Sequence, residues 1–78
     1  MQFMVIETFK DGCFDKVYKR FNRNGRMMPD GMSYIKSWVT HDEKKCYQII
    51  ECETENLIPE WTKNWDDIVE FEFSLLKM

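Results

Sequence analysis

The sequence lacks the cysteine and histidine patterns that crosslink or metallate small proteins. Its 78 residues contain three cysteines, Cys13, Cys46 and Cys52, with no CxxC motif, and their odd number argues against a disulfide framework. The single histidine, His41, lies in a polar stretch with no visible partner, which disfavours a catalytic role and makes haem ligation a weak alternative. One histidine also excludes most metal sites, so we expect neither a metal nor a cofactor.

The sequence also lacks a strongly basic surface and a long apolar run. Its formal net charge is −3, and its one basic cluster is typical of a solvated helix face (Lys16, Lys19, Arg20, Arg23 and Arg26). No segment reaches the roughly 18 apolar residues of a membrane span. The N-terminal stretch has a short apolar run without the basic region of a signal peptide. We therefore expect a soluble, reduced, cytoplasmic protein that binds neither nucleic acid nor membrane.

What the sequence does contain is enough apolar surface for one core. Hydrophobic residues make up 44% of the chain and aromatic residues 15%, which is typical of a globular protein, and the length allows a single domain over residues 1–78. A chain of this length buries only about 60–65% of its unfolded surface, so its stability alone is marginal. A subunit interface would add stability, which favours a homo-oligomer.

Hydrophobic periodicity predicts six elements. They are strands over 2–9, 32–40, 46–53 and 68–75 and helices over 13–24 and 56–65. For the first helix, Asp11 or Gly12 is the expected cap at the start, and Gly25 is the expected left-handed residue past the end. The second helix is expected to start after Asn56, because Pro59 then falls in the first turn, where backbone amides lack intrahelical partners.

This order of elements predicts an α+β fold of the ferredoxin-like, split βαββαβ type. Its four-stranded antiparallel sheet would have the strand order 4-1-3-2 and both helices on one face. The first strand is apolar on both parities, which indicates a central strand with two covered faces. Because the helices can cover only one face, a second copy of the sheet is the expected cover for the other, giving a homodimer with a barrel-like interior.

The stretch EWTKNWDD places Trp61 and Trp65 on one face of the second predicted helix. The simplest interpretation is a sheet-facing stripe of the core, and the alternative is a pocket lined by one indole edge. Asp66 and Asp67 fall where the helix ends, and adjacent residues on a turn do not provide the facing carboxylates of a catalytic pair. They are expected to make the turn into the last strand.

Polar residues interrupt the two predicted central strands. Glu7 follows an apolar run in the first, and Gln48 and Glu51 interrupt the third. Buried polar groups need partners, and a carboxyl in a dry interior has a raised pKa. These residues either line a ligand pocket or are satisfied by pairing or by solvent at the strand ends. The possible pairing partners are Arg26, Lys36 and Tyr34.

Several blocks of the sequence resemble a known family. They are MVIETF at 4–9, RF at 20–21, GRMMPDGMSYIKSW at 25–38, CYQIIE at 46–51 and WTKNWDDIVEFE at 61–72. They are similar to a family of short, mostly bacterial proteins known as a domain of unknown function, which looks like a branch of the dimeric α+β barrel superfamily. That superfamily also includes cofactor-independent monooxygenases, stress-response barrels and relatives of chlorite dismutase. The resemblance implies the same fold and a homodimer, and it implies no particular activity.

Two functional hypotheses follow. The first is a non-catalytic homodimeric module that binds a small molecule or a partner. The second is a cofactor-independent, monooxygenase-like or related barrel enzyme that acts on a small aromatic substrate. In both, the candidate ligand-binding residues are Glu7, Tyr34, Trp38, Gln48, Glu51, Trp61 and Trp65. A large, closed, dry cavity with convergent polar atoms, of roughly 300 Å³ or more beside Glu7 or Gln48, favours a small-molecule site. A filled core with Glu7 and Glu51 in salt bridges favours the non-catalytic module, which binds a metabolite or a partner or serves only as a structural subunit.

Overall fold

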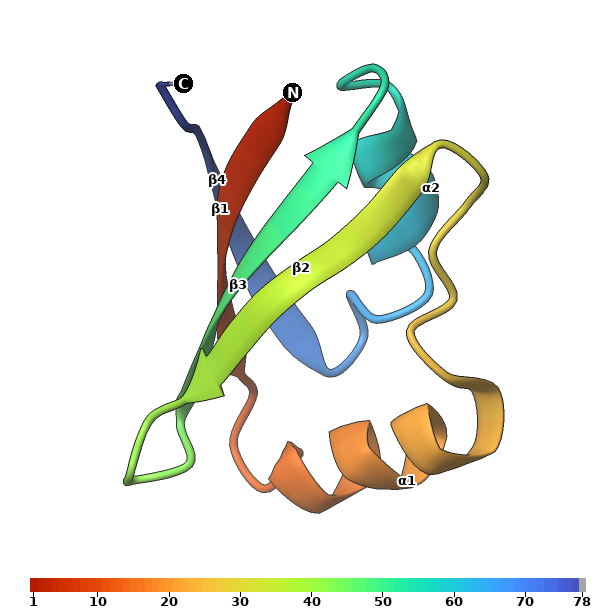
Figure 1. The fold of residues 1–78 in the computed structure, drawn as a ribbon. Coiled ribbons are helices and arrows are strands. Elements are labelled where there is room, and N and C mark those ends of the chain that lie inside the picture. The colour runs from red at the N-terminus through yellow and green to blue at the C-terminus, as the bar shows by residue number, and fades with distance from the viewer. Residues whose placement is uncertain (78) are drawn as a thin grey trace.

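The architecture is a four-stranded antiparallel sheet with two helices (Figure 1). The computed structural model describes residues 1–77. The elements are β1 (Gln2–Phe9), α1 (Phe14–Asn24), β2 (Met32–Val39), β3 (Lys45–Cys52), α2 (Leu57–Thr62) and β4 (Val69–Leu75). The strand order β2-β3-β1-β4 confirms the predicted βαββαβ arrangement, with β1 and β3 in the centre.

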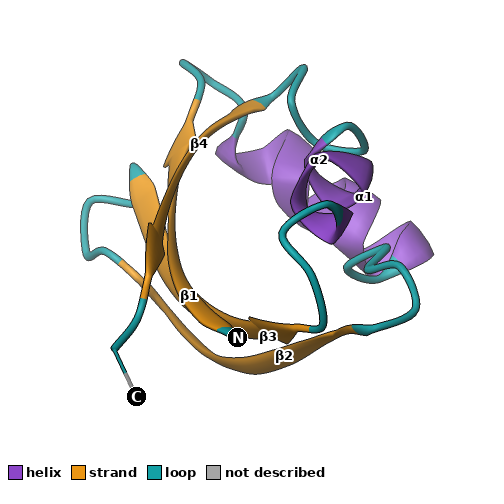
Figure 2. Ribbon diagram, turned by 90° about the horizontal axis from the view of Figure 1, so that it is seen from above, coloured by secondary structure: helices purple, strands orange, loops and turns teal. Residues whose placement is uncertain are grey.

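The sheet is curved, and both helices lie on its concave side (Figure 2). Val5 on β1 pairs with Gln48 on β3, and both side chains are buried on the side that carries the helices. Their neighbours Met4 and Ile49 also pair, and their side chains point to the opposite side because successive residues of a strand alternate. We call these two sides the helix face and the open face of the sheet.

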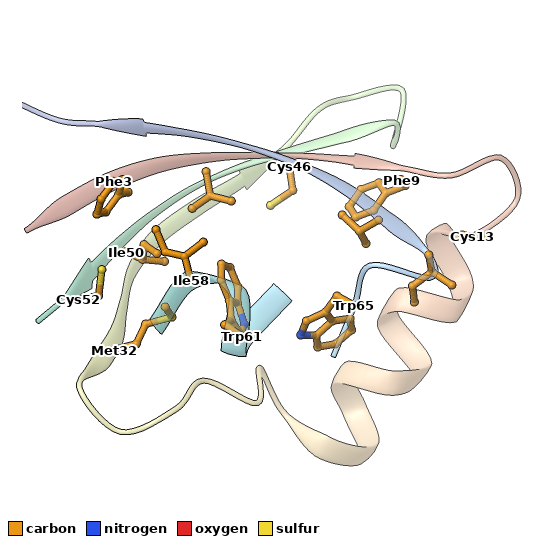
Figure 3. Close-up of a cluster of buried hydrophobic side chains, with 13 residues drawn as sticks. Phe3, Phe9, Cys13, Met32, Cys46, Ile50, Cys52, Ile58, Trp61 and Trp65 are labelled. Carbon is orange, nitrogen blue, oxygen red and sulfur yellow. The ribbon is translucent and has the colours of Figure 1, made fainter. Parts of the chain in front are cut away.

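The core lies between the helix face and the helices (Figure 3). Val5 and Ile50, from the two central strands, have no exposed surface, and burying a side chain of this size stabilises the fold by about 1.5–3 kcal/mol. The other buried members come from all four strands, from α2 and from the connecting segments, and residues of α1 pack against them partly buried. They are Phe3, Phe9, Cys13, Met32, Cys46, Cys52, Ile58, Trp61, Trp65, Ile68 and Val69. Within residues 1–77, no helix is long and apolar enough to cross a membrane.

The first helix ends at the predicted residue, but its N-cap lies further along the chain than predicted. Cys13 is the N-cap and makes no side-chain cap, so the prediction of Asp11 or Gly12 is wrong. Gly12 has a φ of 72° and belongs to the turn after β1, and this left-handed conformation cannot be part of a right-handed helix. At the other end, Gly25 has a φ of 69°, and its N–H donates to the Phe21 carbonyl, which confirms a glycine past the last turn.

The second helix is shorter than predicted and begins at the predicted place. Asn56 is its N-cap and Pro59 lies in the first turn, where the missing proline N–H costs no helical hydrogen bond. The regular helix ends at Thr62, and the chain continues in turns in which the Trp65 N–H donates to the Thr62 carbonyl over 2.8 Å. Trp65 therefore lies just past the helix and still packs in the core.

The edge strand β2 contains an irregularity that changes which residues share a face. The simple alternation predicts Met32, Tyr34, Lys36 and Trp38 on one face. In the structure the pairing register shifts between Tyr34 and Lys36, so that Tyr34 pairs with Ile50 and Trp38 pairs with Tyr47. A bulge inserts one residue and reverses the side of every later side chain. Tyr34 therefore lies on the helix face and Trp38 on the open face, which corrects the prediction.

Candidate functional site

A pocket of about 110 Å³ lies between the helix face of the sheet and the two helices. Its lining comes from three strands, both helical segments and the loop after α1, and consists of Glu7, Phe9, Val17, Tyr18, Phe21, Arg26, Ser37, Val39, Cys46, Gln48, Trp61 and Trp65. Tyr18 and Val39 are the lining residues with large exposed apolar side chains, so they mark its mouth. The interior is mostly aromatic, with polar groups supplied by the central strands and by Arg26.

The two tryptophans of EWTKNWDD hold the loop that carries Arg26. Trp61 Nε1 and Trp65 Nε1 each donate a hydrogen bond to the backbone carbonyl oxygen of Arg26 over 3.0 Å. A carbonyl oxygen has two lone pairs, so one acceptor satisfies both buried indole donors. Asn64 Nδ2 donates to the next carbonyl, that of Met27, over 3.3 Å. The tryptophans are therefore core residues that also position the loop, and their N–H groups are not free for a ligand.

The side chain of Arg26 lies between two aromatic rings. Its Cζ atom is 3.6 Å from the centroid of the Tyr34 ring and 5.0 Å from that of the Phe21 ring. Such stacking holds the guanidinium plane by its faces and leaves the N–H groups at its edge available. In the part of the chain that the structure describes, these N–H groups have neither a hydrogen-bond acceptor nor an ion-pair partner. Arg26 thus brings unpaired donors to the pocket.

Glu7 and Gln48 lie on the same face of the sheet, a point on which the sequence patterns are silent. Glu7 pairs with Cys46 across the two central strands, and Gln48 is the next residue of β3 on that face. Burial raises the pKa of the Glu7 carboxyl from 4.5 to about 7, and the positive charge of Arg26 opposes this rise only in part. Glu7 is therefore half protonated near neutral pH, which is the range in which a carboxyl can both donate and accept a proton.

Gln48 is the buried polar residue with an unmet hydrogen-bonding need. Its side chain is 4% exposed, and its Nε2 atom has no hydrogen-bond partner among residues 1–77. Leaving a buried donor unpaired costs about 1–3 kcal/mol, so a side chain in this state is unfavourable unless something else occupies the pocket.

The Cys46 thiol beside Glu7 is not poised as a nucleophile. Burial raises its pKa to about 11, and the neighbouring Glu7 carboxyl adds to that rise. Because the thiolate is the reactive form, this cysteine stays a protonated, inert thiol at neutral pH. All three cysteines are free, and no group of three potential metal-ligating side chains occurs among the residues that the structure describes.

The seven sequence-predicted candidates fall into two groups. Glu7, Gln48, Trp61 and Trp65 line the pocket, and Tyr34 lies behind it as the ring that Arg26 stacks on. The other two lie elsewhere. Trp38 is 46% exposed on the open face, and Glu51 accepts a hydrogen bond of 3.2 Å from the amino group of Met1 beside a shallow depression at the far end of the sheet.

The paired aspartates have a structural environment, as the sequence predicts. Asp67 receives two hydrogen bonds of 2.8 Å from the Arg20 guanidinium, and Arg20 also donates to the Asn64 carbonyl over 2.8 Å. The Arg20 hydrogen bonds lower the pKa of Asp67 to about 2. This bidentate contact ties α1 to the turns after α2 and lies outside the pocket.

Eight lining residues were not predicted as site residues, and Arg26 is the charged one among them. The sequence patterns indicate Arg26 only as a possible salt-bridge partner. It follows Gly25 in a loop with no periodicity, and nothing in its own neighbourhood predicts its burial. The indication lies elsewhere in the chain, in two tryptophans whose indole N–H groups need an acceptor.

Comparison with known proteins identifies the family of the chain. Residues 1–75 match the family described as domain of unknown function DUF3303. The chain belongs to the DUF3303 family. Searches of the curated proteins and of the solved structures find no match to the chain. For this DUF3303 protein, function must therefore be inferred from the pocket itself.

Proposed function

We propose that this DUF3303 protein is a homodimeric α+β barrel module of the cytoplasm that binds one small molecule per protomer in the pocket beside Glu7 and Gln48. The observation that carries the proposal is the buried Gln48 side chain, which lines the pocket and whose Nε2 atom has no hydrogen-bond partner among residues 1–77. Arg26 lines the same pocket. Convergent polar groups in an otherwise apolar pocket are the usual composition of a ligand site. A purely structural core would be expected to satisfy the Gln48 amide, because buried polar groups are nearly always hydrogen-bonded.

The volume of the pocket limits the size of the ligand. Sites for drug-sized molecules occupy about 300–1,000 Å³, whereas this pocket measures about 110 Å³. An engineered apolar cavity of about 150 Å³ accepts benzene. A single ring, or a short branched chain, is therefore the largest body that fits without the fold opening, and any further part of the ligand must extend through the mouth between Tyr18 and Val39.

The homodimer is proposed from the open face of the sheet. Its centre carries Met4, Ile6, Trp38, Tyr47 and Ile49, which share this face by register and together form an apolar stripe. Its edges carry opposite charges, with Lys36 and Lys45 on the β2–β3 side and Glu70 and Glu72 on β4. A contiguous apolar stripe with complementary charged edges is suited to a second copy of the same face. Two sheets packed this way would enclose a barrel-like interior, as in the dimeric α+β barrels.

An enzymatic variant of the proposal is supported by Glu7. A carboxyl with a pKa of about 7 in an aromatic pocket can remove a proton from an acidic C–H or O–H group of a bound ring. Removal of a proton is also the step that activates an electron-rich aromatic substrate toward oxygen, so a cofactor-independent monooxygenase-like reaction on a small aromatic substrate is the second candidate. The binding function comes first because it requires only the unpaired donors.

The proposed function is tested by the melting temperature in the presence of one-ring fragments. The panel contains acidic, neutral and basic fragments at high concentration. A ligand present at 100 times its dissociation constant stabilises the folded state by about 2.7 kcal/mol, which gives a clear rise in melting temperature. Val39→Trp, which narrows the mouth, is expected to abolish the rise. Absence of any rise in the parental protein, or an equal rise in the Val39→Trp variant, would contradict a ligand site in this pocket.

A further inference from the structure

Two residues of the pocket carry hydrogen-bond donors that lack acceptors among residues 1–77. Arg26 presents guanidinium N–H groups without an acceptor, and Gln48 presents a buried Nε2 donor without one, both within residues 1–77. The backbone carbonyl of Arg26 is already occupied by the two indoles. A ligand that completes this pocket must therefore bring acceptors.

The acceptor group must also suit the positive charge of Arg26. A carboxylate offers about four lone-pair sites in one plane and matches a guanidinium fork. Cation–π contacts with Tyr34 and Phe21 hold the Arg26 guanidinium in place. Its planar fork matches a planar carboxylate better than a spherical anion. The remaining walls are aromatic or aliphatic and suit an apolar body.

One group in the pocket opposes an anion, and that group is Glu7. Its neighbours on this face of the sheet are Cys46 from β3 and Phe71 from β4. The other side chains of the pocket that bear on its charge are Arg26 from the loop, Tyr18 from α1, Ser37 from β2, Trp61 from α2 and Trp65 from the turns after α2. None of these is an acid, so Glu7 is the only carboxyl in the lining that the structure describes. Whether the pocket accepts an anion therefore depends on the proton of Glu7.

We infer that the ligand is a monocarboxylic acid with a body no larger than one aromatic ring, bound as its carboxylate by Arg26 and Gln48 next to a protonated Glu7. This inference rests on the proposed function and specifies its ligand class. Protonated Glu7 adds a third donor, so the three groups together would surround the carboxylate. A neutral or cationic ring would leave the Arg26 guanidinium unpaired.

The affinity of the pocket for a carboxylate should depend on pH. Burial raises the pKa of Glu7 to about 7, so about ten-elevenths of the protein carries the proton at pH 6 and about one-eleventh at pH 8. When only the protonated form binds, the apparent dissociation constant is the intrinsic one divided by that fraction. Affinity for the carboxylate should then fall about tenfold from pH 6 to pH 8, with uptake of up to one proton per ligand.

The probes that test this are benzoate, benzamide and benzylamine, which share a ring and differ in charge. Each is titrated into the parental protein at pH 6 and pH 8 while the indole N–H signals are followed by NMR. Trp61 and Trp65 report on the pocket, and Trp38 on the open face is an internal control. We expect benzoate to bind more tightly than the other two, to shift only the pocket indoles, and to lose about tenfold in affinity at pH 8.

Substitutions test which residues bind benzoate and which residue causes the pH dependence. Arg26→Gln removes the guanidinium while keeping the backbone carbonyl that holds both indoles, and it is expected to weaken benzoate binding at least about tenfold. Arg23→Gln, at an exposed position of α1, is the matched control and should bind as the parental protein does. Gln48→Leu provides a second test of the donor set should Arg26→Gln fold poorly. Glu7→Gln, which cannot ionise, should flatten the pH dependence.

The outcomes separate the two levels of the proposal. Binding of benzamide or benzylamine in the pocket without preferential binding of benzoate would overturn the carboxylate inference and leave the proposed function standing. Benzoate affinity that is equal at pH 6 and pH 8 would also overturn it. No shift of the pocket indoles with any probe would overturn the inference and the proposed function together.

Discussion

On β1, side chains that point toward the helices and side chains that point away are both mostly apolar, yet their surroundings differ. Phe3 and Val5 on the helix face are 3% and 0% exposed. Met4 and Ile6, which alternate with them on the open face, remain partly exposed. The same contrast separates the tryptophans, because Trp61 is 3% exposed and Trp38 is 46% exposed.

The apolar pattern of β1 predicts a cover for both faces and does not indicate what covers them. The helices of this chain cover one face. The open face has the composition of a covered face and lacks a cover within residues 1–77. The helix face has the opposite peculiarity, because it is covered and still holds Glu7 and Gln48. The open face is thus more apolar than is usual for a surface in contact with solvent. The helix face is more polar than is usual for a hydrophobic core.

The largest difference between the faces is expected from truncating their tryptophans. Trp61→Ala removes a buried indole and leaves a cavity, which should cost about 3–5 kcal/mol of a total stability of about 5–15 kcal/mol. Trp38→Ala, on the open face, should leave the stability of the protomer nearly unchanged. Urea unfolding of both variants at a protein concentration below the dissociation constant of the proposed dimer measures the contrast, because association then adds nothing to the stability. A Trp61→Ala protein with near-parental stability would place Trp61 in an open pocket rather than in the core.

The second effect is a dependence of folding stability on pH, caused by Glu7 on the helix face. The folded-state pKa of Glu7 is raised to about 7, above its usual 4.5, so the unfolded chain releases this proton first as pH rises. Folding stability should therefore fall between pH 4.5 and pH 7, by about 1.4 kcal/mol per unit or about 3 kcal/mol in all. Below pH 4.5 both states hold the proton, and the effect is absent.

Glu7→Gln isolates this effect because it replaces the carboxyl by a neutral group of the same shape. The stability of the variant relative to the parental protein should increase steadily from pH 4.5 to pH 7 in urea unfolding. Glu60→Gln makes the same substitution at an exposed site of α2 and is the control. A difference between Glu7→Gln and the parental protein that is constant across this pH range would show that Glu7 is not desolvated.

The third effect concerns the open face. Ile49→Glu places a charge in the middle of the apolar stripe, where a second copy would have to desolvate it. We expect the dissociation constant of the dimer to rise at least a hundredfold, or about 2.8 kcal/mol, with the circular dichroism of the fold retained. Sedimentation equilibrium measures both proteins, with Ser33→Glu at the edge of the same face as the control. A parental protein that is monomeric at micromolar concentration would contradict the proposed dimer.

The smallest effect is expected away from both faces. Asp67→Asn removes the contact with Arg20 that lowers the pKa of Asp67 to about 2, and such exposed pairs stabilise little. At low salt the melting temperature of the variant should be slightly below that of the parental protein. At high salt, which screens the Arg20–Asp67 pair, the difference between the two proteins should shrink. The stabilisation is present above pH 3.8 and is lost as pH falls toward about 2. Asp66→Asn, the neighbouring acid without this contact, should have no effect, and equal effects of the two would show that the Arg20 contact is not specific.

The fold could be predicted from the sequence because local and tertiary signals agree. The pattern over residues 2–9, the glycine at Gly25 and the proline at Pro59 each indicate one conformation, and the structure has it. The bulge near Ile35 could not be predicted, because both alternations of MSYIKSWV are chemically plausible and register is decided by pairing with β3. This one shift moves Trp38 from the predicted site to the other side of the sheet.

The pocket could be predicted only in part. Glu7 and Gln48 are visible as polar interruptions of apolar strands, and the structure shows that they share a face. Arg26 was not predictable as their neighbour, because its position depends on hydrogen bonds from residues 35 and 39 positions further along the chain. Contacts of that length leave no periodic pattern in a single sequence.

The central claim is that the helices cover one face of the sheet and a second copy covers the other. The most direct test is broadening of the three indole N–H signals by a soluble paramagnetic agent, in the parental protein and in Ile49→Glu. We expect the Trp61 and Trp65 signals to be protected in both proteins. The Trp38 signal should be protected in the parental protein and strongly broadened in the variant. Equal and strong broadening of Trp38 in both proteins would contradict the central claim, because the open face would then be exposed to solvent in the native state.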